Sequence, residues 1–325
     1  MPSEFELKKQ ICEFGRRMHQ AGFVAANDGN LSCRAGKGRY LCTPANVSKG
    51  FMTPEMICTL DDAGRQVAGA CKPTSEIKLH LQIYRERPEV DAVCHAHPPH
   101  ATAFATSGVP LPSYVMPEVE MLLGQVPLAP YHTPGSQQVA ESIVPFLRQK
   151  VNTILLSNHG AVAFDRDLEQ AYFHLETLET YCRILLLAKQ IGAIRQLPQS
   201  KALELLEIKK SLGLADPRID GDMQPAVLAG SDDFLRGFST RAIPQHSSGP
   251  DGHGRGSGIA NMPSQAGQPQ PALPGPVVAT VAGRVIPAPG GLGSSSATAR
   301  RRAMDDQIER LVQAITDEVV GSTAR

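Results

Sequence analysis

The sequence predicts an α/β fold in which helices cover both faces of a central sheet, a three-layer α/β/α arrangement. Short apolar segments typical of buried strands alternate with segments whose apolar residues recur at helical spacing. This alternation is characteristic of α/β domains. The composition stays that of an ordinary globular domain over residues 1–213. The segments expected to form strands lie near residues 39–43, 56–60, 90–95 and 153–157.

The first expected element is a helix over residues 3–21. Ser3 can cap its N-terminus, because a serine side chain accepts a hydrogen bond from a free backbone N–H. Gly22 ends the helical pattern. The apolar residues that share one face of this helix are Leu7, Ile11, Phe14 and Met18.

Two further helices are expected downstream. Residues 75–86 carry Ile77, Leu81 and Tyr84 at helical spacing. Residues 167–191 form one long expected helix with a continuous apolar face. That face consists of Leu168, Ala171, Leu175, Leu178, Cys182 and Leu185.

The chain changes character twice after the domain. Residues 214–298 are expected to be a disordered, flexible linker, since glycine and proline dominate residues 244–293 and little there could form a core. Residues 299–325 are expected to form a short amphipathic helix, which alone in water would be marginal, so its apolar face needs a partner. A tethered docking peptide, docking on its own domain, self-association and a disordered end all stay open for it. Its apolar residues, at steps of three and four, are Met304, Ile308, Leu311, Val312, Ile315 and Val319.

Charge and cysteine content narrow the class of protein. Lysine and arginine number 32 and aspartate and glutamate 32, so electrostatics favours neither nucleic acid nor an anionic membrane as the main partner. No apolar run reaches the length of a membrane span. The N-terminus lacks the basic and apolar segments of a secretory signal. The seven cysteines are odd in number and form no Cys-x-x-Cys motif, which favours reduced thiols and a cytoplasmic location.

Two histidines at the end of an apolar segment, His95 and His97, predict a metal site. Residues two apart on an extended strand point to the same side, so both imidazoles can bind one ion. Glu76 and His159, which follows another apolar segment, can complete the ligand set. Three histidines and a glutamate suit a divalent Lewis acid, with zinc the leading candidate. A single isolated histidine would more simply be interpreted as a hydrogen-bonded core residue. A pair on one face of a strand, with a third histidine at the end of another strand, favours a metal site. Cys94 is expected to point to the opposite side, as a small core residue.

Three polar turns can bind an anion. Backbone amides exposed in residues 27–32 can face a phosphate, and residues 43–46 form a second turn. Thr74 and Ser75 precede an expected helix, where hydroxyls and free amides suit a phosphate. Each turn alone is a weak signal, because such turns usually cap or reverse the chain. Next to a metal ligand at Glu76, they together predict a phosphate bound beside a Lewis acid.

Six motifs occur in the order in which the class II aldolase/adducin family has them, and on these motifs residues 5–213 resemble that family. The motifs are Asn-x-Gly-Asn-Leu-Ser, Thr-Pro, (Thr/Ser)-Ser-Glu, His-x-His-(x)-Pro, Ala-Pro-Tyr and Asn-His-Gly. The resemblance implies a mixed α/β sandwich that assembles as a homotetramer with active sites between subunits. It also implies one zinc ion per subunit, held by His95, His97 and His159.

The resemblance further assigns roles to single residues. Glu76 would ligate the metal when the site is empty and act as acid and base during turnover. The residues implied to contact the substrate phosphate are Gly29, Asn30, Thr43, Thr74 and Ser75. The implied reaction is zinc-dependent cleavage of a ketose 1-phosphate, of the fuculose or rhamnulose type, to dihydroxyacetone phosphate and lactaldehyde.

The sequence departs from the family at its catalytic tyrosine, which falls near residues 115–117. The nearest tyrosine is Tyr114, about two places away. Glu118 or Glu120 could take over protonation of the leaving oxygen. Tyr131, in the Ala-Pro-Tyr motif, is expected to be a structural residue.

A turn position also departs from the family. Ala45 and Asn46 replace the family's Thr-Gly. Asparagine tolerates the left-handed conformation that glycine would use there.

Three other functions stay open. A pentulose-phosphate 4-epimerase or a sugar-phosphate dehydratase would use the same metal and phosphate groups. A non-catalytic, adducin-like binding protein is of a different class, and the retention of all four potential ligands disfavours it.

The tail has a resemblance of its own. Residues 311–319 are similar to the encapsulation peptides of bacterial microcompartment enzymes. This implies microcompartment shell proteins as partners and the microcompartment lumen as a location.

Overall fold

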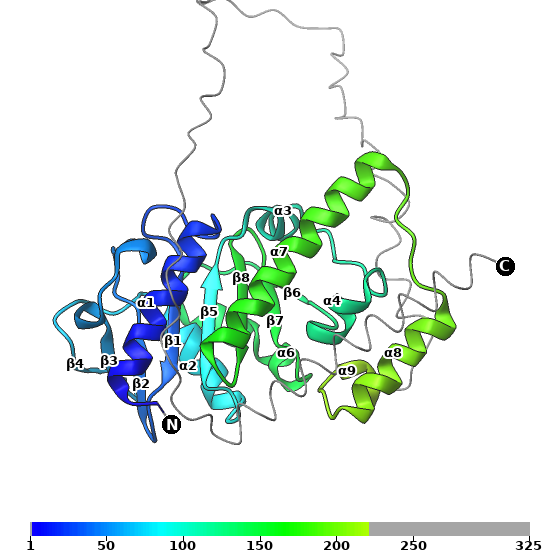
Figure 1. Cartoon of the computed structure of the whole chain (residues 1–325). Helices are drawn as coiled ribbons and strands as arrows, with labels where there is room; N and C mark the ends of the chain where they lie inside the picture. Colours follow the sequence, from blue (N-terminus) through cyan, green and yellow to red (C-terminus); the bar gives the residue numbers. More distant parts are fainter. Residues whose placement is uncertain (1, 221–325) are drawn as a thin grey trace, which may run out of the picture. The chain divides into compact units, whose positions relative to one another are not determined.

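The computed structural model describes residues 2–220 (Figure 1). The linker and the C-terminal helix expected after that point lie outside the described residues. The described fold continues past residue 213, where the sequence places the start of the linker. Asp216 and Arg218 are buried, at 3% and 6% exposure.

The described residues form one eight-stranded sheet, in the order β4-β3-β2-β1-β5-β8-β7-β6. All neighbouring strands are antiparallel except β6 and β7, which are parallel. The strands are β1 (Asn30–Arg34), β2 (Arg39–Cys42), β3 (Cys58–Asp61), β4 (Gln66–Ala68), β5 (Ala92–Ala96), β6 (Leu128–Ala129), β7 (Thr153–Leu156) and β8 (Gly160–Asp165).

Helices pack on both faces of this sheet. They are α1 (Glu4–Gln20), α2 (Ile77–Glu86), α3 (Pro99–Ser107), α4 (Pro117–Leu122), α5 (Gln137–Ser142), α6 (Val144–Arg148), α7 (Leu168–Ile191), α8 (Gln199–Ser211) and α9 (Pro217–Asp220). Two 3-10 turns, η1 (Lys49–Phe51) and η2 (Pro54–Met56), lie between β2 and β3. In Figure 1, α1 and α7 run across the same face of the sheet.

Each face of the sheet has its own hydrophobic core, and β5 shows why. Successive strand residues point to opposite faces. Ala92, Cys94 and Ala96 belong to the core shared with α1, α3 and α7, whereas Val93 belongs to the core shared with α2 and α6. The predicted mixed α/β fold, with helices on both faces, is therefore confirmed.

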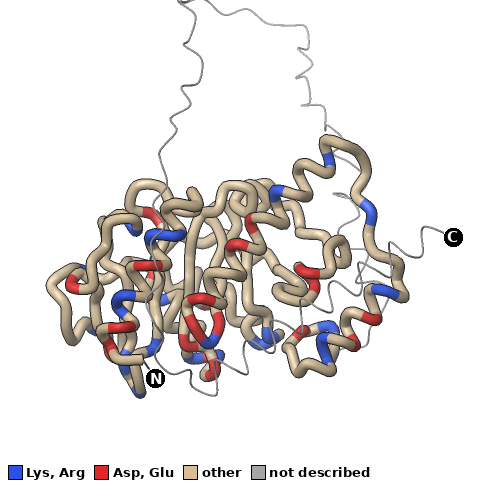
Figure 2. Tube along the Cα trace, viewed as in Figure 1, with Lys and Arg blue, Asp and Glu red and all other residues tan. Residues whose placement is uncertain are grey.

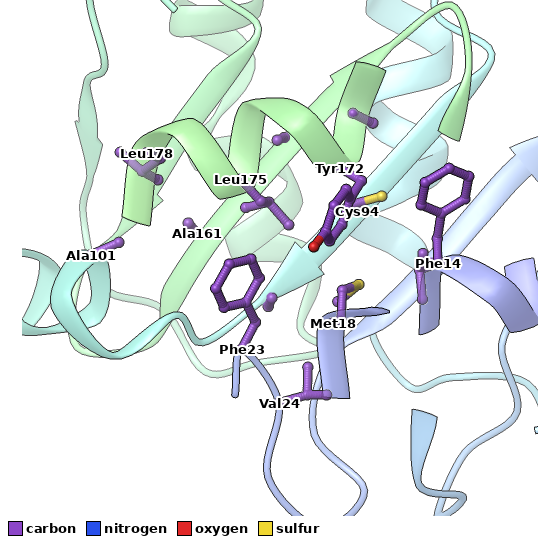
Figure 3. Packing of buried hydrophobic residues seen from close by; sticks show 14 of the residues in the cluster. Phe14, Met18, Phe23, Val24, Cys94, Ala101, Ala161, Tyr172, Leu175 and Leu178 are labelled. Carbon is purple, nitrogen blue, oxygen red and sulfur yellow. The ribbon is translucent and has the colours of Figure 1, made fainter. Parts of the chain in front are cut away.

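The core beneath α1 and α7 contains Cys94, as predicted. Figure 3 shows its thiol among Phe14, Met18 and Tyr172. The Phe14 and Tyr172 rings have centroids 5.6 Å apart, a contact that adds about 0.5–1.5 kcal/mol beyond the burial of apolar surface. Because Cys94 occupies this face, the next residue of β5, His95, points to the other face.

The predicted helix termini are nearly those of the structure. Ser3 caps α1, with its Oγ accepting a 3.2 Å hydrogen bond from the amide of Glu6. Asp167 caps α7 by accepting a 2.8 Å bond from the amide of Gln170. The helix predicted from residue 75 begins at Ile77 instead, because the residues just before it form a turn.

Two central strands were missed by the sequence pattern. The sequence predicts a turn over residues 27–32, but β1 already begins at Asn30. Strand β8 begins at Gly160, the last residue of the Asn-His-Gly motif. Residues 160–164 of β8 are all buried, so this strand shows no clear alternation of polar and apolar side chains. In β1 polar and apolar residues do alternate, but the strand has only five residues and starts inside the polar motif.

The bulk predictions can be checked on the described residues. None of the seven cysteines forms a disulfide, and all but Cys71 are buried. No described helix is long and apolar enough to cross a membrane. Acidic and basic residues are interspersed along the described chain (Figure 2).

A buried ionic cluster joins α8 and α9 to α4. The Arg218 guanidinium lies 2.7 Å from a Glu120 carboxylate oxygen and 2.7 Å from Asp216. Lys209 donates to Asp216 at 2.8 Å and to the backbone carbonyl of Glu120 at 2.9 Å. The cluster also covers Tyr114, whose ring centroid is 4.8 Å from the guanidinium. The segment that follows α3 is therefore held in place by the C-terminal part of the described fold.

Candidate metal centre and anion pocket

The two histidines of the His-x-His motif converge, as strand geometry predicts. His95 is the fourth residue of β5, and His97 follows directly after the strand. Their Nε2 atoms are 3.3 Å apart. His95 is fully buried, whereas His97 is partly exposed at the edge of the site.

Glu76 and His159 reach the same point from two other parts of the fold. Glu76 is the N-cap residue of α2, and its Oε2 lies 3.3 Å from His95 Nε2. His159 lies in the turn between β7 and β8, with its Nε2 3.4 Å from Glu76 Oε1. The structure thus brings together all four residues that the sequence proposed as ligands.

Two glycines allow these segments to approach one another. A Cβ atom on Gly160 would lie 2.5 Å from the carbonyl oxygen of Ala96 and 2.6 Å from Cδ2 of His97. Gly29, whose φ is +69°, would place a Cβ atom 2.9 Å from the carbonyl oxygen of His95. Distances below 3 Å are not tolerated between such atoms, so a side chain at either position would displace the histidine pair.

Hydrogen bonds orient the two histidines of the motif for metal binding. The Nδ1 atom of His95 is 2.9 Å from the carbonyl oxygen of Ala161, and a carbonyl can only accept. Nδ1 therefore carries the proton, and the lone pair on Nε2 is free. The Nδ1 atom of His97 faces a carboxylate oxygen of Asp28 at 3.4 Å, which favours the same tautomer.

The donor set fits a divalent metal ion. For metal–ligand bonds of ~2.0–2.1 Å, ligand atoms at the corners of a tetrahedron lie ~3.3–3.4 Å apart. The Nε2 atoms of His95 and His97 are 3.3 Å apart, which matches this spacing. Each oxygen of the Glu76 carboxylate also lies 3.3–3.4 Å from one histidine nitrogen, Oε2 from His95 and Oε1 from His159. The histidine nitrogens all lie within 4.8 Å of one another. Glu76 Oε1 is buried without a hydrogen-bond partner among the described residues, as expected for an atom that a metal or a proton satisfies.

Burial and mutual charge shift the pKa values of these residues. Burial raises the pKa of Glu76, but His95, His159 and the Asn30 amide outweigh it and hold that pKa well below its usual range. Burial and the charge of His95 together lower the pKa of His159 to about 4. Burial and the charge of His95 likewise lower the pKa of His97. Burial lowers the pKa of His95, but the Glu76 carboxylate outweighs this effect and raises it. Metals bind neutral imidazoles and an ionised carboxylate, so metal binding would release the proton from His95.

A pocket of about 230 Å³ opens beside these ligands. Its lining includes most of the residues predicted to contact phosphate, together with three of the four candidate ligands. The lining residues are Asn27, Asp28, Gly29, Asn30, Pro44, Ala45, Asn46, Lys49, Thr74, Ser75, Glu76, His97, Pro134 and His159. Asn46 has a φ of 59°, the left-handed conformation that the sequence predicts for it.

Two of the predicted phosphate contacts are placed differently from the rest. Thr43 is fully buried and does not line the pocket, and its Oγ1 accepts a 3.2 Å hydrogen bond from the amide of Leu31. Asn30 lines the pocket, but its side-chain amide is used internally, with Nδ2 donating to Glu76 Oε2 at 2.7 Å. Gly29, Thr74 and Ser75 line the pocket.

Lys49 is a pocket residue that the sequence analysis did not identify. Among the described residues that line the pocket, it is the one lysine or arginine. Its Nζ donates to the carbonyl oxygens of Asn27 at 2.8 Å and Val47 at 2.6 Å, and burial lowers its pKa to about 8. A single lysine after a turn carries no sequence signal of its own, so only the fold could identify it.

The residues considered as substitutes for the family tyrosine lie away from the pocket lining. Tyr114 is buried against α8, at 6% exposure. Glu120 is paired with Arg218 and accepts a hydrogen bond from the amide of Tyr114. Glu118 and Tyr131 are not lining residues either, and Tyr131 is 55% exposed. The expectation that Glu120 could serve in proton transfer is therefore wrong for the described arrangement, because its carboxylate holds the ionic cluster.

Comparison with known proteins supports an enzyme of one family. Residues 9–186, more than half of the chain, match the class II aldolase and adducin N-terminal domain. A 3-oxo-tetronate 4-phosphate decarboxylase of Cupriavidus necator is 32% identical over 212 residues, covering 63% of this chain and 96% of that protein. An L-fuculose phosphate aldolase of Methanococcus maripaludis is 35% identical over 175 residues, covering 54% of this chain and 92% of that protein.

Solved structures agree with these sequence relatives. YgbL of Escherichia coli, a candidate aldolase, epimerase or decarboxylase, has a TM-score of 0.58 at 28% identity, covering 62% of this chain and 98% of YgbL. An L-fuculose 1-phosphate aldolase has a TM-score of 0.58 at 28% identity, covering 63% of this chain and 96% of that chain. The names of these relatives support the prediction of an enzyme with lyase activity. With its fold, motif order and ligand geometry in agreement, the chain belongs to the class II aldolase and adducin family.

Proposed function

We propose that this chain is a metal-dependent lyase that breaks a carbon–carbon bond in a phosphorylated sugar or sugar acid, with one zinc ion per subunit. The convergence of three histidine nitrogens and the Glu76 carboxylate beside an anion pocket carries the proposal. A divalent ion there would polarise a substrate carbonyl and stabilise the negative charge that bond breaking leaves next to it.

Glu76 is the residue to which we assign proton transfer. Its Oε2 accepts the hydrogen bond from Asn30, whereas its Oε1 has no hydrogen-bond partner among the described residues. Oε1 can therefore take up or return a proton at the substrate carbon that faces the pocket. Such positioned proton transfer accelerates reactions by about 10²–10⁴-fold.

Thr74, Ser75 and Lys49 would bind the substrate phosphate. The two hydroxyl residues precede α2, whose first backbone N–H groups have no partner within the helix and attract anions. Lys49 adds a positive charge to the same pocket.

The first candidate reaction is aldol cleavage of a ketose 1-phosphate of the fuculose or rhamnulose type, to dihydroxyacetone phosphate and lactaldehyde. The decarboxylase relative suggests the second, loss of carbon dioxide from a 3-oxo-tetronate 4-phosphate. Both substrates contain the same three-carbon unit, a phosphorylated carbon next to a ketone and a hydroxyl-bearing carbon. Both reactions release that unit as dihydroxyacetone phosphate, so one pocket can serve either reaction.

A specific observation favours the second candidate. Aldol cleavage needs a group that exchanges a proton with the oxygen that becomes the aldehyde. Carbon dioxide leaves a carboxylate without such an exchange. Within one subunit, no tyrosine of the described residues lines the pocket, and Glu120 is held by Arg218.

Product analysis tests these assignments. Purified protein with zinc is incubated separately with fuculose 1-phosphate, rhamnulose 1-phosphate and 3-oxo-tetronate 4-phosphate. Dihydroxyacetone phosphate without carbon dioxide identifies an aldolase, and with carbon dioxide a decarboxylase. An isomeric pentulose phosphate from its own substrate, or loss of water without a triose, would contradict carbon–carbon cleavage and support the epimerase or dehydratase. Protein without stoichiometric metal, unaffected by His97→Ala, would support the non-catalytic alternative.

We also propose assembly and location from the two resemblances. The family resemblance supports a homotetramer in the cytoplasm. The resemblance of residues 311–319 to encapsulation peptides supports transfer into a microcompartment through shell proteins. Fusing residues 299–325 to a fluorescent protein should give punctate fluorescence in a host that makes shells. Diffuse fluorescence in that host would contradict encapsulation.

A further inference from the structure

A row of five buried polar side chains leads from the metal site into the core between β1 and α2. Asn30 Nδ2 is 2.7 Å from Glu76 Oε2, and its Oδ1 is 2.6 Å from His80 Nε2. His80 Nδ1 is 2.6 Å from Ser32 Oγ, which is 2.8 Å from the hydroxyl of Tyr84. None of the five side chains belongs to a residue more than 9% exposed.

The spacing of a helix and a strand explains why these residues interleave. Glu76, His80 and Tyr84 are four residues apart at the start of α2 and along it, which places them on one face about 6 Å apart. Asn30 and Ser32 are two residues apart on β1, on one face and about 6.6 Å apart. The two repeats nearly match, so each strand side chain bridges two consecutive helix side chains.

The direction of every hydrogen bond in the row follows by elimination. A carboxylate oxygen can only accept, so the Asn30 amide nitrogen faces Glu76 and the amide oxygen faces His80. His80 Nε2 must therefore carry a proton. Burial lowers the pKa of His80 to about 3, so the ring is neutral and its Nδ1 accepts from the Ser32 hydroxyl. Ser32 Oγ in turn accepts from Tyr84.

We propose that His80 is a positioning residue that, through Asn30, holds the Glu76 carboxylate in its working orientation. The protonated Nε2 of His80 fixes which way the Asn30 amide points. The amide then occupies Glu76 Oε2 and leaves Oε1 as the unpartnered oxygen that faces His159, 3.4 Å away. The catalytic consequence of this role rests on the proposed function, in which Glu76 transfers a proton.

Two substitutions separate positioning from simple space filling. His80→Gln keeps an N–H donor near the position of Nε2, whereas His80→Asn keeps a polar atom only near Nδ1. If His80 acts through Asn30, His80→Asn should lower kcat by about 10–100-fold and weaken binding of Co²⁺ by about tenfold. His80→Gln should stay within a few-fold of the wild type in both measurements. Equal losses in both folded variants, or no loss in either, would overturn the proposal.

A measurement on the wild type keeps the proposal testable if a variant does not fold. In the ¹⁵N spectrum of metal-free protein labelled at histidine, the resonance assigned to His80 should show a neutral ring protonated at Nε2. A ring protonated at Nδ1, or a charged ring, would overturn the proposal.

Failure of the proposed function has a different signature. A wild type that cleaves none of the offered sugar phosphates contradicts the proposed function. The Co²⁺ titrations and the His80 tautomer still decide whether His80 positions Glu76, since neither needs turnover.

Discussion

Asn30 connects two of the candidate metal ligands at once. Its side chain donates a 2.7 Å hydrogen bond to Glu76, which is 46 residues later in the chain, and its backbone pairs with His95 in the β1–β5 ladder. The N-terminus of α2 and the end of β5 are thereby aligned by one residue of β1. A substitution of Asn30 should therefore disturb the positions of Glu76 and His95, even if Asn30 itself does not contact the substrate.

Replacing Asn30 by aspartate tests this connection. Asn30→Asp is nearly isosteric but places a second carboxylate against Glu76, and two carboxylates in contact cannot both stay ionised. We expect kcat/KM to fall by about 10–100-fold and the acid limb of the pH–rate profile to move to higher pH. Steady-state kinetics across pH measures both effects. A profile that moves to lower pH would contradict the arrangement.

Metal content provides the second prediction. Purified protein should contain about one equivalent of a divalent metal per chain, since its donor set matches a three-histidine site. A chelator should remove both metal and activity. His97→Ala and His159→Ala should each lose the metal, measured by elemental mass spectrometry. His19→Ala, which changes an exposed histidine on α1, should keep it.

Lys49 leads to a pH-dependent stability difference. Its folded pKa is lowered to about 8, from an ordinary value of 10.5, mainly by burial. Below pH 8 both the folded and the unfolded chain carry the ammonium, so the cost of burying it is fully present. Between pH 8 and 10.5 the folded chain loses the proton first, and this cost is relieved as pH rises.

Lys49→Met should therefore raise the free energy of unfolding at pH 7, by at most about 3 kcal/mol. The difference from the wild type should shrink toward pH 10.5. Urea unfolding of both proteins from pH 7 to pH 10.5 measures it, with Lys9→Met as a control for loss of an exposed lysine. A difference that stays constant across this range would contradict the shifted pKa.

The buried ionic cluster gives the fourth prediction. Arg218→Met leaves the Glu120 and Asp216 carboxylates buried without the guanidinium, and we expect a loss of about 3–5 kcal/mol in the free energy of unfolding. Arg148→Met is the matched control. Arg148 is mostly exposed and 3.6 Å from Glu86, so its loss should cost less than about 1 kcal/mol. Equal effects of the two substitutions in urea unfolding would contradict the structural role of the cluster.

Local patterns in the sequence were enough to predict the mixed α/β fold, the capped helices α1 and α7, and the convergence of His95 and His97. These features depend on spacing within one element, where a period of two or of about four residues decides which side chains share a face. Strand β1 was missed because its alternation of polar and apolar residues spans only Asn30–Arg34 and starts inside a polar, glycine-containing motif that is typical of a turn. The contact of Asn30 with Glu76 joins residues 46 positions apart, which no local pattern predicts.

The sequence by itself determined which residue types could bind a metal and, through the order of its motifs, the family. Only the tertiary structure decided which polar side chains are available in the pocket. In the structure Thr43 is a buried core residue, and the Asn30 amide is hydrogen-bonded to Glu76 and His80. Lys49 lines the pocket, whereas Glu120 is paired with Arg218 and does not line it. The physical reason is that a polar atom engaged in a hydrogen bond or an ion pair within the protein is not available to bind a ligand. Which partner uses it depends on segments that are far apart in the chain and meet only when the sheet has formed.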